Sequence, residues 1–512
     1  MLRRLGVAAC FSLILALALS ASLSVSAGAD WPKFHNDLGN TGFNPAETAI
    51  SPGNVGNLRL AWSAPNFGMG SAPVVVGGEV IAPCWPNAVC AVDAATGQAR
   101  WTHAVGHGYL PSNVAVSAGI VYAGGTDPAV MYALNAQTGA VIWTWPSPAP
   151  AYDATAAPHL FAAPTVFNGT VFAEADDWKL YAFDASTGAV RWTQAVYGLS
   201  TPAISDGVLF VEGDPNLQTP DQGALLAINA QTGQILWRTM TQWGAGDDSP
   251  SVAAGLVYTG SRNTPSSGHP NFWAYRASGC GLPLCPPVWT SSGGSYARSS
   301  PAVANGLVYE GFGDGRLYAF DAATGQRRWS GITQDSQSAN PVGMWSSPAV
   351  ANGVVLVASG DGSFYAFNAA GCGQASCSPL WRSTTAHSYQ FGSSPAIANG
   401  MVYVTGFGSC SAAYCGHLDA FRVIPGRPDR ATPPQVPQSG SGNPNVNTVN
   451  RLPSVVTDDR PQATYRAAFR TRASSGFTPA PASMAGSSVW ISAVSAATGD
   501  LLRRIIAILL HR

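Results

Sequence analysis

The sequence predicts an all-β fold, an eight-bladed β-propeller of four-stranded antiparallel blades whose ring is closed by an N-terminal strand. Two repeated segments and the composition of the chain predict it. Charged residues make up 10% of the 512 residues, whereas Gly counts 56 and Pro 38. This composition suits many short strands joined by tight turns and disfavours long surface helices.

The first repeat contains a Thr-Gly turn and ends in Trp. Its template, A-x-[DN]-x-x-T-G-x-x-x-W, occurs at residues 91–101, 133–143, 182–192, 227–237 and 319–329. In two variants, residues 274–289 and 366–381, a cysteine loop replaces the turn. The units end at Trp62, Trp101, Trp143, Trp192, Trp237, Trp289, Trp329 and Trp381. A spacing of about 40 to 50 residues is typical of propeller blades. We expect each indole to pack between blades with its N–H on a backbone carbonyl.

One unit, residues 300–329, illustrates how a blade forms. Four strands are predicted, at residues 301–304, 307–310, 316–320 and 326–329. Asn305-Gly306 supplies the positive φ values of the two-residue turn between the first two strands. One such sheet cannot bury both of its faces, so neighbouring blades must stack.

The count of first strands predicts how the ring closes. Eight first strands start near Ser71, Asn113, Ala163, Thr201, Ser249, Ser300, Ser347 and Ser394. The eighth unit ends near residue 422 without its Trp, while residues 58–62 form an outer strand with no unit of their own. Pairing these two segments closes the ring and removes both sheet edges. Residues 494–502 faintly resemble the turn template, and we interpret that resemblance as chance.

The N-terminus predicts the compartment. Residues 1–29 have the features of a signal peptide: Arg3 and Arg4 precede an apolar run, and Ala27 and Ala29 fit cleavage before Asp30, with the bond after Ala27 as the alternative. Cys10 follows a segment like a lipoprotein box, but the apolar run before it is too short. We therefore expect a secreted or otherwise extracytoplasmic protein.

Three regions follow the signal peptide. Residues 30–424 form the propeller, residues 425–488 a Pro-, Ser- and Asn-rich linker predicted to be disordered, and residues 489–512 a tail that includes the pattern of one short amphipathic helix. That helix is too short and too charged to span a bilayer. The formal net charge of −1 offers no electrostatic footprint for nucleic acid, and we expect a monomer.

Eight of the nine cysteines form four close pairs. Even numbers and short gaps in an exported chain favour local disulfides. The alternative, a zinc site, typically uses C-x2-C with a second pair or His nearby, and that pattern is missing from the sequence. The predicted pairs are Cys84 with Cys90, Cys280 with Cys285, Cys372 with Cys377, and Cys410 with Cys415.

The Trp-ended template and the lead-in at residues 30–44, DWPKFHNDLGNTGFN, resemble the PQQ-like β-propeller family. The resemblance covers roughly residues 30–422 and is specific for the fold. This superfamily includes PQQ-dependent alcohol dehydrogenases as well as non-catalytic scaffolds such as BamB of outer-membrane assembly. Fold alone does not choose between these functions.

The enzyme alternative implies PQQ and Ca²⁺ as cofactors, with a catalytic carboxylate near the quinone. Well-known members of that class hold the quinone against a ring formed by two adjacent cysteines, and this sequence has no Cys-Cys pair. It also lacks C-x-x-C-H, G-x-S-x-G and H-E-x-x-H motifs, and its His residues show no ligand spacing. We therefore assign no catalytic residue, metal ligand or cofactor, and we favour a non-enzymatic binding or assembly scaffold.

The face with the long loops is the predicted binding face, for a protein or polymer partner. Long insertions fall between blades at residues 144–160 and 331–345 and within blades at 213–223 and 260–270, and long loops often carry function. The predicted ligand candidates at the channel mouth are Asp247, Asp248, Arg298 and Trp345. The alternative for these four is an Arg–Asp ion pair beside an aromatic side chain. The acidic cluster at residues 174–177 is interpreted as a solvated turn.

Overall fold

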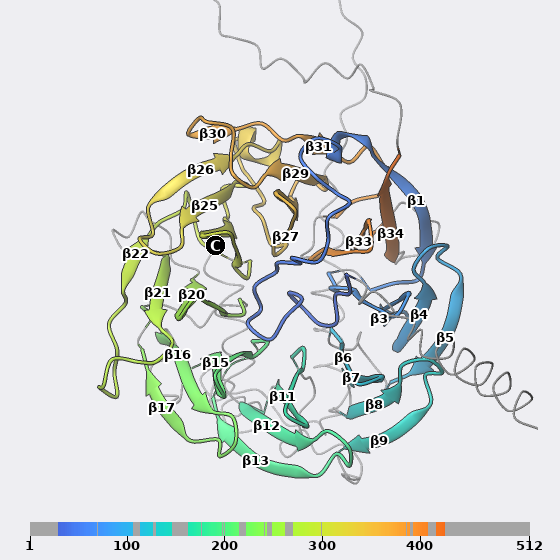
Figure 1. Ribbon diagram of the computed structural model, residues 1–512, viewed down its shortest axis with the longest axis vertical. Helices are drawn as coiled ribbons and strands as arrows, with labels where there is room; N and C mark the ends of the chain where they lie inside the picture. Colours follow the sequence, from blue (N-terminus) through green and yellow to red (C-terminus); the bar gives the residue numbers. More distant parts are fainter. Residues whose placement is uncertain are drawn as a thin grey trace, which may run out of the picture. The chain divides into compact units, whose positions relative to one another are not determined.

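The computed structural model describes residues 29–424, with gaps at 69, 106–112, 126–129, 146–161, 176, 197, 199, 214–221, 240, 243–247, 262–269, 298, 386, 390–392 and 408–415. Its strands form eight separate sheets, arranged as the blades of one β-propeller (Figure 1). Each blade contains four strands paired antiparallel, and blades 4 and 6 each carry one extra short strand. The predicted fold class is therefore confirmed.

Each blade runs from a short inner strand to an outer strand. Blade 1 consists of β2 (Val74–Val76), β3 (Glu79–Cys84), β4 (Ala88–Asp93) and β5 (Ala99–Ala104), and blade 2 of β6 (Ala115–Ser117), β7 (Ile120–Gly124), β8 (Met131–Asn135) and β9 (Val141–Trp145). Blade 3 consists of β10 (Thr165–Phe167), β11 (Thr170–Ala175), β12 (Lys179–Asp184) and β13 (Val190–Ala195). Blade 4 consists of β14 (Ala203–Ser205), β15 (Val208–Gly213), β16 (Gln222–Asn229) and β17 (Ile235–Arg238), with β18 (Thr241–Gln242) beside β16.

The other four blades repeat this order. Blade 5 consists of β19 (Ser251–Ala253), β20 (Leu256–Gly260), β21 (Phe272–Arg276) and β22 (Trp289–Ser291), and blade 6 of β23 (Ala302–Ala304), β24 (Leu307–Gly311), β25 (Leu317–Asp321) and β26 (Arg327–Gly331), with β30 (Ser376–Cys377) beside β26. Blade 7 consists of β27 (Ala349–Ala351), β28 (Val354–Ala358), β29 (Phe364–Asn368) and β31 (Trp381–Arg382). Blade 8 consists of β32 (Ala396–Ala398), β33 (Met401–Phe407), β34 (Gly416–Val423) and β1 (Leu58–Pro65). The short 3-10 helices η1 (Val55–Asn57) and η3 (Asp335–Gln337) lie in connecting segments.

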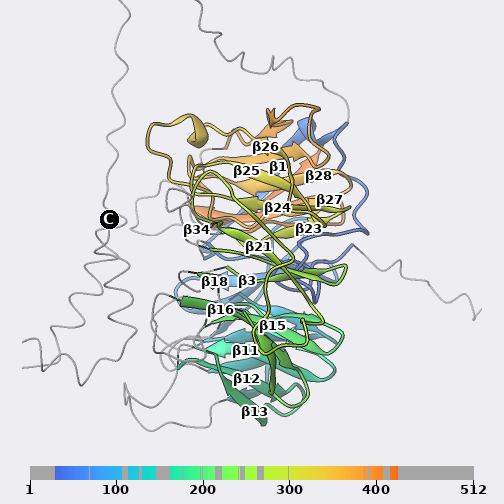
Figure 2. The same ribbon diagram turned by 90° about the vertical axis from the view of Figure 1, so that its left-hand side faces the viewer.

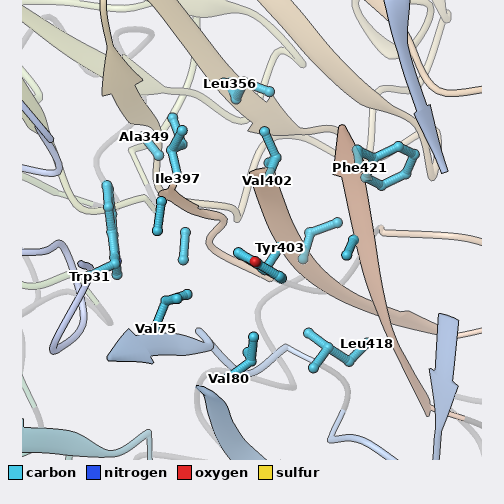
Figure 3. Packing of buried hydrophobic residues seen from close by; sticks show 14 of the residues in the cluster. Trp31, Val75, Val80, Ala349, Leu356, Ile397, Val402, Tyr403, Leu418 and Phe421 are labelled. Atoms are coloured by element: carbon cyan, nitrogen blue, oxygen red, sulfur yellow. The ribbon is translucent and has the colours of Figure 1, made fainter. Parts of the chain in front are cut away.

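The ring closes as the sequence predicts. β1 pairs antiparallel with β34, so the N-terminal strand becomes the outer strand of blade 8. The core at this closure joins residues from both ends of the propeller, among them Val75, Ile397, Tyr403 and Phe421, which Figure 3 shows. Closure gives every blade a neighbour on each side, which a propeller needs to bury both faces of each sheet.

Each blade-ending Trp is hydrogen-bonded to the next blade. The indole N–H donates to a backbone carbonyl, with nitrogen–oxygen distances from 2.8 Å at Trp101 to 3.3 Å at Trp237. The same bond is made by Trp62, Trp143, Trp192, Trp289, Trp329 and Trp381. For seven of these Trp residues, all except Trp381, a turn glycine of the next blade lies against the ring: a Cβ on Gly325, whose φ is +72°, would lie 2.5 Å from Trp289. Only glycine fits both the backbone angle and the contact.

Three of the four predicted disulfides are present, which confirms the pairings Cys84–Cys90, Cys280–Cys285 and Cys372–Cys377. The fourth predicted disulfide is not among them: Cys410 and Cys415 both lie outside the described residues, so the bond between Cys410 and Cys415 stays a prediction.

The disulfides of blades 5 and 7 close loops that reach over the outer edge of the preceding blade. β30, which ends at Cys377, runs parallel to β26 as a fifth strand, and Leu284 forms the equivalent parallel bridge to Arg238. Each of these cysteine loops therefore covers a strand edge of its neighbour.

The signal-peptide, linker and tail predictions fall on residues that the structure does not describe. Within the described ranges, no helix is long and apolar enough to cross a membrane.

Candidate functional site

The N-terminal segment, residues 31–44, crosses the middle of the ring (Figure 1). Its backbone bonds to the central residue of one inner strand after another, for example Trp31 to Val75 at 2.7 Å and Gly39 to Val252 at 2.7 Å. Its inner-strand partners belong to seven of the eight blades: Val75, Val116, Ile204, Val252, Val303, Val350 and Ile397. Figure 2 shows this blue segment on the side of the ring opposite to β18. The segment thus closes one end of the channel.

A buried lysine stabilises this segment. Lys33 donates to the backbone carbonyls of Phe34 and Asp37, at 3.0 and 3.1 Å, and to the amide oxygen of Asn40. Asn40 in turn donates to the carbonyls of Thr201 and Pro250, which belong to blades 4 and 5. Burial lowers the pKa of Lys33 to about 7, against the opposing effect of Asp37. The hydrogen bonds of the lysine therefore fix a turn of the N-terminal segment and connect it to the ring.

Hydroxyl groups also connect neighbouring blades, at the residues where the inner strands begin. The residues that open these strands form a chain in which each backbone N–H donates to the next side-chain hydroxyl. The bonds run from Thr201 to Ser249, Ser300, Ser347 and Ser394 at 2.9, 2.8, 2.9 and 3.1 Å. Ala163, the opener of blade 3, has no hydroxyl with which to take part. The Ser-rich strand starts in the sequence therefore act as blade-to-blade connectors.

One residue earlier in each blade lies a second polar position. Ser200, Ser299, Ser346 and Ser393 accept a backbone N–H from the second strand of their own blade, at 2.8 to 3.2 Å. In blade 5 the equivalent residue is Asp248, which is buried. A carboxyl group thus replaces a hydroxyl at one position in the wall of the propeller.

Asp248 belongs to a buried acidic cluster with Glu174, Glu212 and Glu310, from blades 3, 4 and 6. A Cβ on Gly260 would lie 3.1 Å from Oδ2 of Asp248 and 3.8 Å from Oε1 of Glu310, so these two carboxyl groups meet at that glycine. Hydroxyl groups donate to the other members: Ser200 to Glu174 at 3.2 Å and Thr259 to Glu212.

Burial dominates the electrostatics of this acidic cluster. It raises the pKa of Glu174 well above its ordinary value, against hydrogen bonds from Ser200 that lower it. It also raises the pKa of Glu310, and the nearby charges of Asp248 and Glu212 raise it further. Glu310 accepts a 2.8 Å hydrogen bond from Ser299, and its Oε2 has no hydrogen-bond partner among the described residues. Burial therefore disfavours the ionised form of both glutamic acids.

Of the four predicted ligand candidates, the structure describes Asp248 and Trp345. Asp248 lies in the buried wall with Glu310. Trp345 is half-buried on the segment between blades 6 and 7, where its N–H donates to the carbonyl of Val342 at 3.2 Å. Asp247 and Arg298 lie outside the described residues, so their role remains a prediction.

The interpretation of residues 174–177 as a solvated turn is wrong for Glu174, which is fully buried. Asp177 does lie near the surface, where it pairs with Lys179 at 2.8 Å and accepts from Tyr181. Sequence reasoning missed Glu212 and Glu310 altogether. The sequence feature that could have revealed them is a single Glu near the end of an otherwise apolar second strand. A carboxyl group buried there must accept a hydrogen bond or be protonated.

A second polar cluster lies between blades 7 and 8. The imidazoles of His387 and His417 stack with centroids 4.1 Å apart and planes 9° apart. His387 Nδ1 and the Tyr389 hydroxyl both bond Oδ2 of the buried Asp419, at 2.6 and 2.7 Å. Burial, together with the neighbouring His387, lowers the pKa of His417. The two histidines lie far apart in the sequence, so spacing could not reveal this pair.

The described residues do not fit a calcium–quinone site. Ca²⁺ takes six to eight oxygen ligands, most often from ionised carboxylates and carbonyls. Here Ser200 engages both oxygens of Glu174, and burial raises the pKa of Glu310, which disfavours its ionised form. Within the described ranges no group of three or more His, Cys, Asp or Glu side chains is arranged to hold a metal ion. No reaction step can be derived from these groups.

Fold and site together define a Trp-docked repeat propeller with a channel closed at one end. The sequence pattern of a family described as outer membrane protein assembly factor BamB matches residues 87–264 and 198–406. That of the β-propeller domain of glucose/ethanol/alcohol dehydrogenases matches residues 31–109. The chain belongs to the PQQ-like β-propeller family.

Individual relatives come from both functional branches. The dehydrogenase subunit of the quinone alcohol dehydrogenase from Gluconacetobacter polyoxogenes is 30% identical over 130 residues, 22% of this chain and 17% of that protein. BamB from Yersinia pestis is 25% identical over 238 residues, 41% of this chain and 56% of that protein. The chain therefore spans little more than half of the latter and much less of the former.

Solved structures show the same fold. BamB from Moraxella catarrhalis superposes with a TM-score of 0.53 at 17% identity, over 72% of this chain and 99% of that one. The quinohemoprotein alcohol dehydrogenase from Comamonas testosteroni superposes with a TM-score of 0.59 at 17% identity, over 86% and 85%. At this identity the likeness shows the fold and leaves the activity open.

Proposed function

We propose that this protein is an extracytoplasmic, non-enzymatic propeller that binds a protein or polymer partner on the face where the second strands lead into the third. The observation that carries the proposal is the N-terminal segment, which bonds to the inner strands of seven blades and closes one end of the channel. With that end closed, a partner can reach the channel only from the opposite face. The signal-peptide pattern and the three disulfides support an oxidising compartment.

The chemistry of the channel wall also supports a scaffold. The hydroxyl groups that open the inner strands are engaged in blade-to-blade bonds, and burial raises the pKa of Glu174 and Glu310, which disfavours their charged forms. A dehydrogenase needs an ionised base and a bound electron acceptor. Polar groups that satisfy one another stabilise the ring and leave little for a substrate.

A PQQ-dependent alcohol or polyol dehydrogenase is the second candidate. It is favoured by the 30% identity to the quinone alcohol dehydrogenase subunit and by the dehydrogenase-type match at residues 31–109. In that case Asp247, Asp248, Arg298 and Trp345 are the first residues to test, since they precede neighbouring inner strands.

Reconstitution separates the two functions. Purified protein from residue 30 to 512 is incubated with PQQ and Ca²⁺, and quinone absorbance and alcohol-dependent dye reduction are followed. We expect no saturable quinone binding and no dye reduction from protein whose cooperative melting shows that it is folded. Saturable binding with dye reduction that Asp248→Asn abolishes would establish the dehydrogenase instead.

A further inference from the structure

The cysteine loops of blades 5 and 7 are structurally equivalent and chemically different. Both cover the outer strand of the preceding blade with the same backbone bonds: Arg238 N–H donates to the Pro283 carbonyl, and Ser330 N–H to the Ala375 carbonyl, each at 3.0 Å. A Cβ on Gly279 would lie 2.5 Å from Trp237, and one on Gly371 would lie 2.6 Å from Trp329. The two loops can therefore be aligned residue by residue.

In this alignment, three exposed leucines of the first loop region correspond to three polar residues of the second. Leu236, Leu282 and Leu284 are 45, 62 and 51% exposed. At the equivalent positions blades 6 and 7 have Arg328, Gln374 and Ser376, which are exposed as well. The fold of the loop thus does not require apolar side chains there, because the second copy forms without them.

Two of the leucines, Leu236 and Leu282, line a groove with a volume of about 480 Å³, together with Val208, Trp237, Pro283 and residues 277–279 and 281. The third, Leu284, is exposed and follows Pro283 in the chain. Its counterpart beside Trp329 is lined by Arg328, Gln374 and the second disulfide loop. The loop residues 281–288, GLPLCPPV, include no charged side chain. Exposed apolar surface concentrated in one concave place is typical of a contact site.

We propose that this groove, the Leu236–Leu282 groove, binds a short apolar peptide segment of another protein. Its size decides the occupant. A stable protein pair buries about 800 Å² on each partner. Three leucines beside one disulfide loop cannot supply that area to a second copy of the chain. The volume does match that of clefts for small ligands, about 300 to 1,000 Å³, which accommodate a few side chains.

The groove lies away from the face of the proposed function. The loop that forms it joins the third and outer strands of blade 5, whereas the proposed partner face lies where second strands lead into third strands. The inference therefore adds a second contact site, and it stands whether or not the propeller binds a quinone.

The test uses the full mature chain and two fluorescein-labelled twelve-residue peptides, one of alternating Leu and Gln and one with every Leu changed to Ser. Fluorescence polarisation measures binding. The triple variant Leu236→Arg, Leu282→Gln, Leu284→Ser replaces the leucines with the residues found at the equivalent positions of blades 6 and 7. Because the loop of blade 7 forms with those residues, we expect the variant to fold. We expect saturable binding of the Leu peptide to the native chain, a loss of at least tenfold in the variant, and none for the Ser peptide.

The reciprocal variant Arg328→Leu, Gln374→Leu, Ser376→Leu should create a second site and double the stoichiometry. If the triple variant fails to fold, Leu282→Gln alone, at the most exposed position, replaces it, with a smaller loss expected. Equal affinity of native and variant chains would overturn the inference. A concentration-dependent dimer in sedimentation velocity that the variant abolishes would overturn it in favour of a second copy. Variant-sensitive binding to phosphatidylcholine vesicles, with none to peptide, would overturn it in favour of lipid.

Discussion

Blade 6 (residues 302–331) and blade 7 (residues 349–382) perform the same structural task with different chemistry. In both, a Trp from the preceding blade donates to an alanine carbonyl in the third turn, Trp289 to Ala322 at 3.0 Å and Trp329 to Ala369 at 3.2 Å. In both, a turn glycine lies against that Trp.

The turns that present these groups differ. In blade 6 the side chain of Asp321 accepts from the backbone N–H of Ala323 and Thr324 and from the Thr324 hydroxyl, at 2.9 to 3.1 Å. In blade 7 Asn368 accepts the corresponding bond from Ala370 at 3.0 Å, and the disulfide Cys372–Cys377 closes the loop. The Trp of the preceding blade therefore requires a carbonyl group and a glycine at fixed positions in the third turn. The bonds that hold this turn in shape can differ from blade to blade.

The largest expected effect tests whether the two turns are equivalent. Trp289→Ala and Trp329→Ala each remove a buried indole, and such changes cost about 3 to 5 kcal/mol. Because the contacts match, we expect the free energy of unfolding in urea to fall by similar amounts. A loss for Trp329→Ala of less than half that for Trp289→Ala would show that the cysteine loop supports its Trp poorly.

The disulfide is the next most important element. Changing Cys372 and Cys377 together to Ser removes a short cross-link, worth about 2 kcal/mol. We also expect faster hydrogen exchange at the backbone N–H groups of Ser330 and Ile332, which bond to Ala375 and Cys377. Cys280→Ser with Cys285→Ser is the matched control, and it should leave those two amides protected.

A smaller effect separates the turn chemistries. Asp321→Ala removes four side-chain hydrogen bonds from an exposed turn, one of them from Arg328 at 2.7 Å, and we expect a loss of about 1 kcal/mol in the free energy of unfolding. Asn368→Ala removes one, and because the disulfide holds the loop we expect no more than half of that loss. Equal losses at both positions would mean that the disulfide does not substitute for the side-chain bonds.

The smallest effect concerns pH. Glu310 of blade 6 occupies the strand position of Val357 in blade 7, and burial raises the pKa of Glu310 above its usual value near 4.5. Its contribution to stability is full below that value and is lost as pH rises through the raised pKa. Glu310→Val should therefore flatten the fall in melting temperature above pH 4.5.

Comparison of Glu310→Val with the native chain isolates this effect, because the other groups whose pKa burial shifts, among them Glu174 and His417, are present in both chains. Above pH 7, Lys33 acts in the opposite direction, since its lowered pKa makes the folded state gain stability as pH rises. Val357→Ala serves as the control for packing and should shift the curve without changing its slope. An unchanged slope in Glu310→Val would show that this acid does not govern the pH dependence.

Much of the fold followed from local sequence. The Thr-Gly-Trp template specifies the third turn and outer strand of five blades, Asn-Gly pairs such as Asn305-Gly306 form hairpin turns, and the leftover strand at residues 58–62 closes the ring. Three disulfides followed from cysteine spacing. These features were predictable because the interacting residues lie within a few positions of each other or recur in every blade.

The candidate sites could be predicted from the sequence only in part. The predicted candidates included Asp248, but not Glu174 as a buried acid or Glu310, whose shared environment comes from separate blades. The stacked His387 and His417 join through the packing of two blades. Reading a lone Glu in an apolar strand as a buried acid would have found the first group, while no local signal marks the second.

By itself, the sequence determined the repeat, the number of blades and the closing strand, because each depends on a local pattern that recurs or is left over. Only the tertiary structure decided that residues 31–44 close the channel, that four carboxyl groups share one wall, and that the cysteine loops of blades 5 and 7 cover their neighbours' edges. The physical reason is that these contacts join residues far apart in the chain, which meet only when the ring has closed.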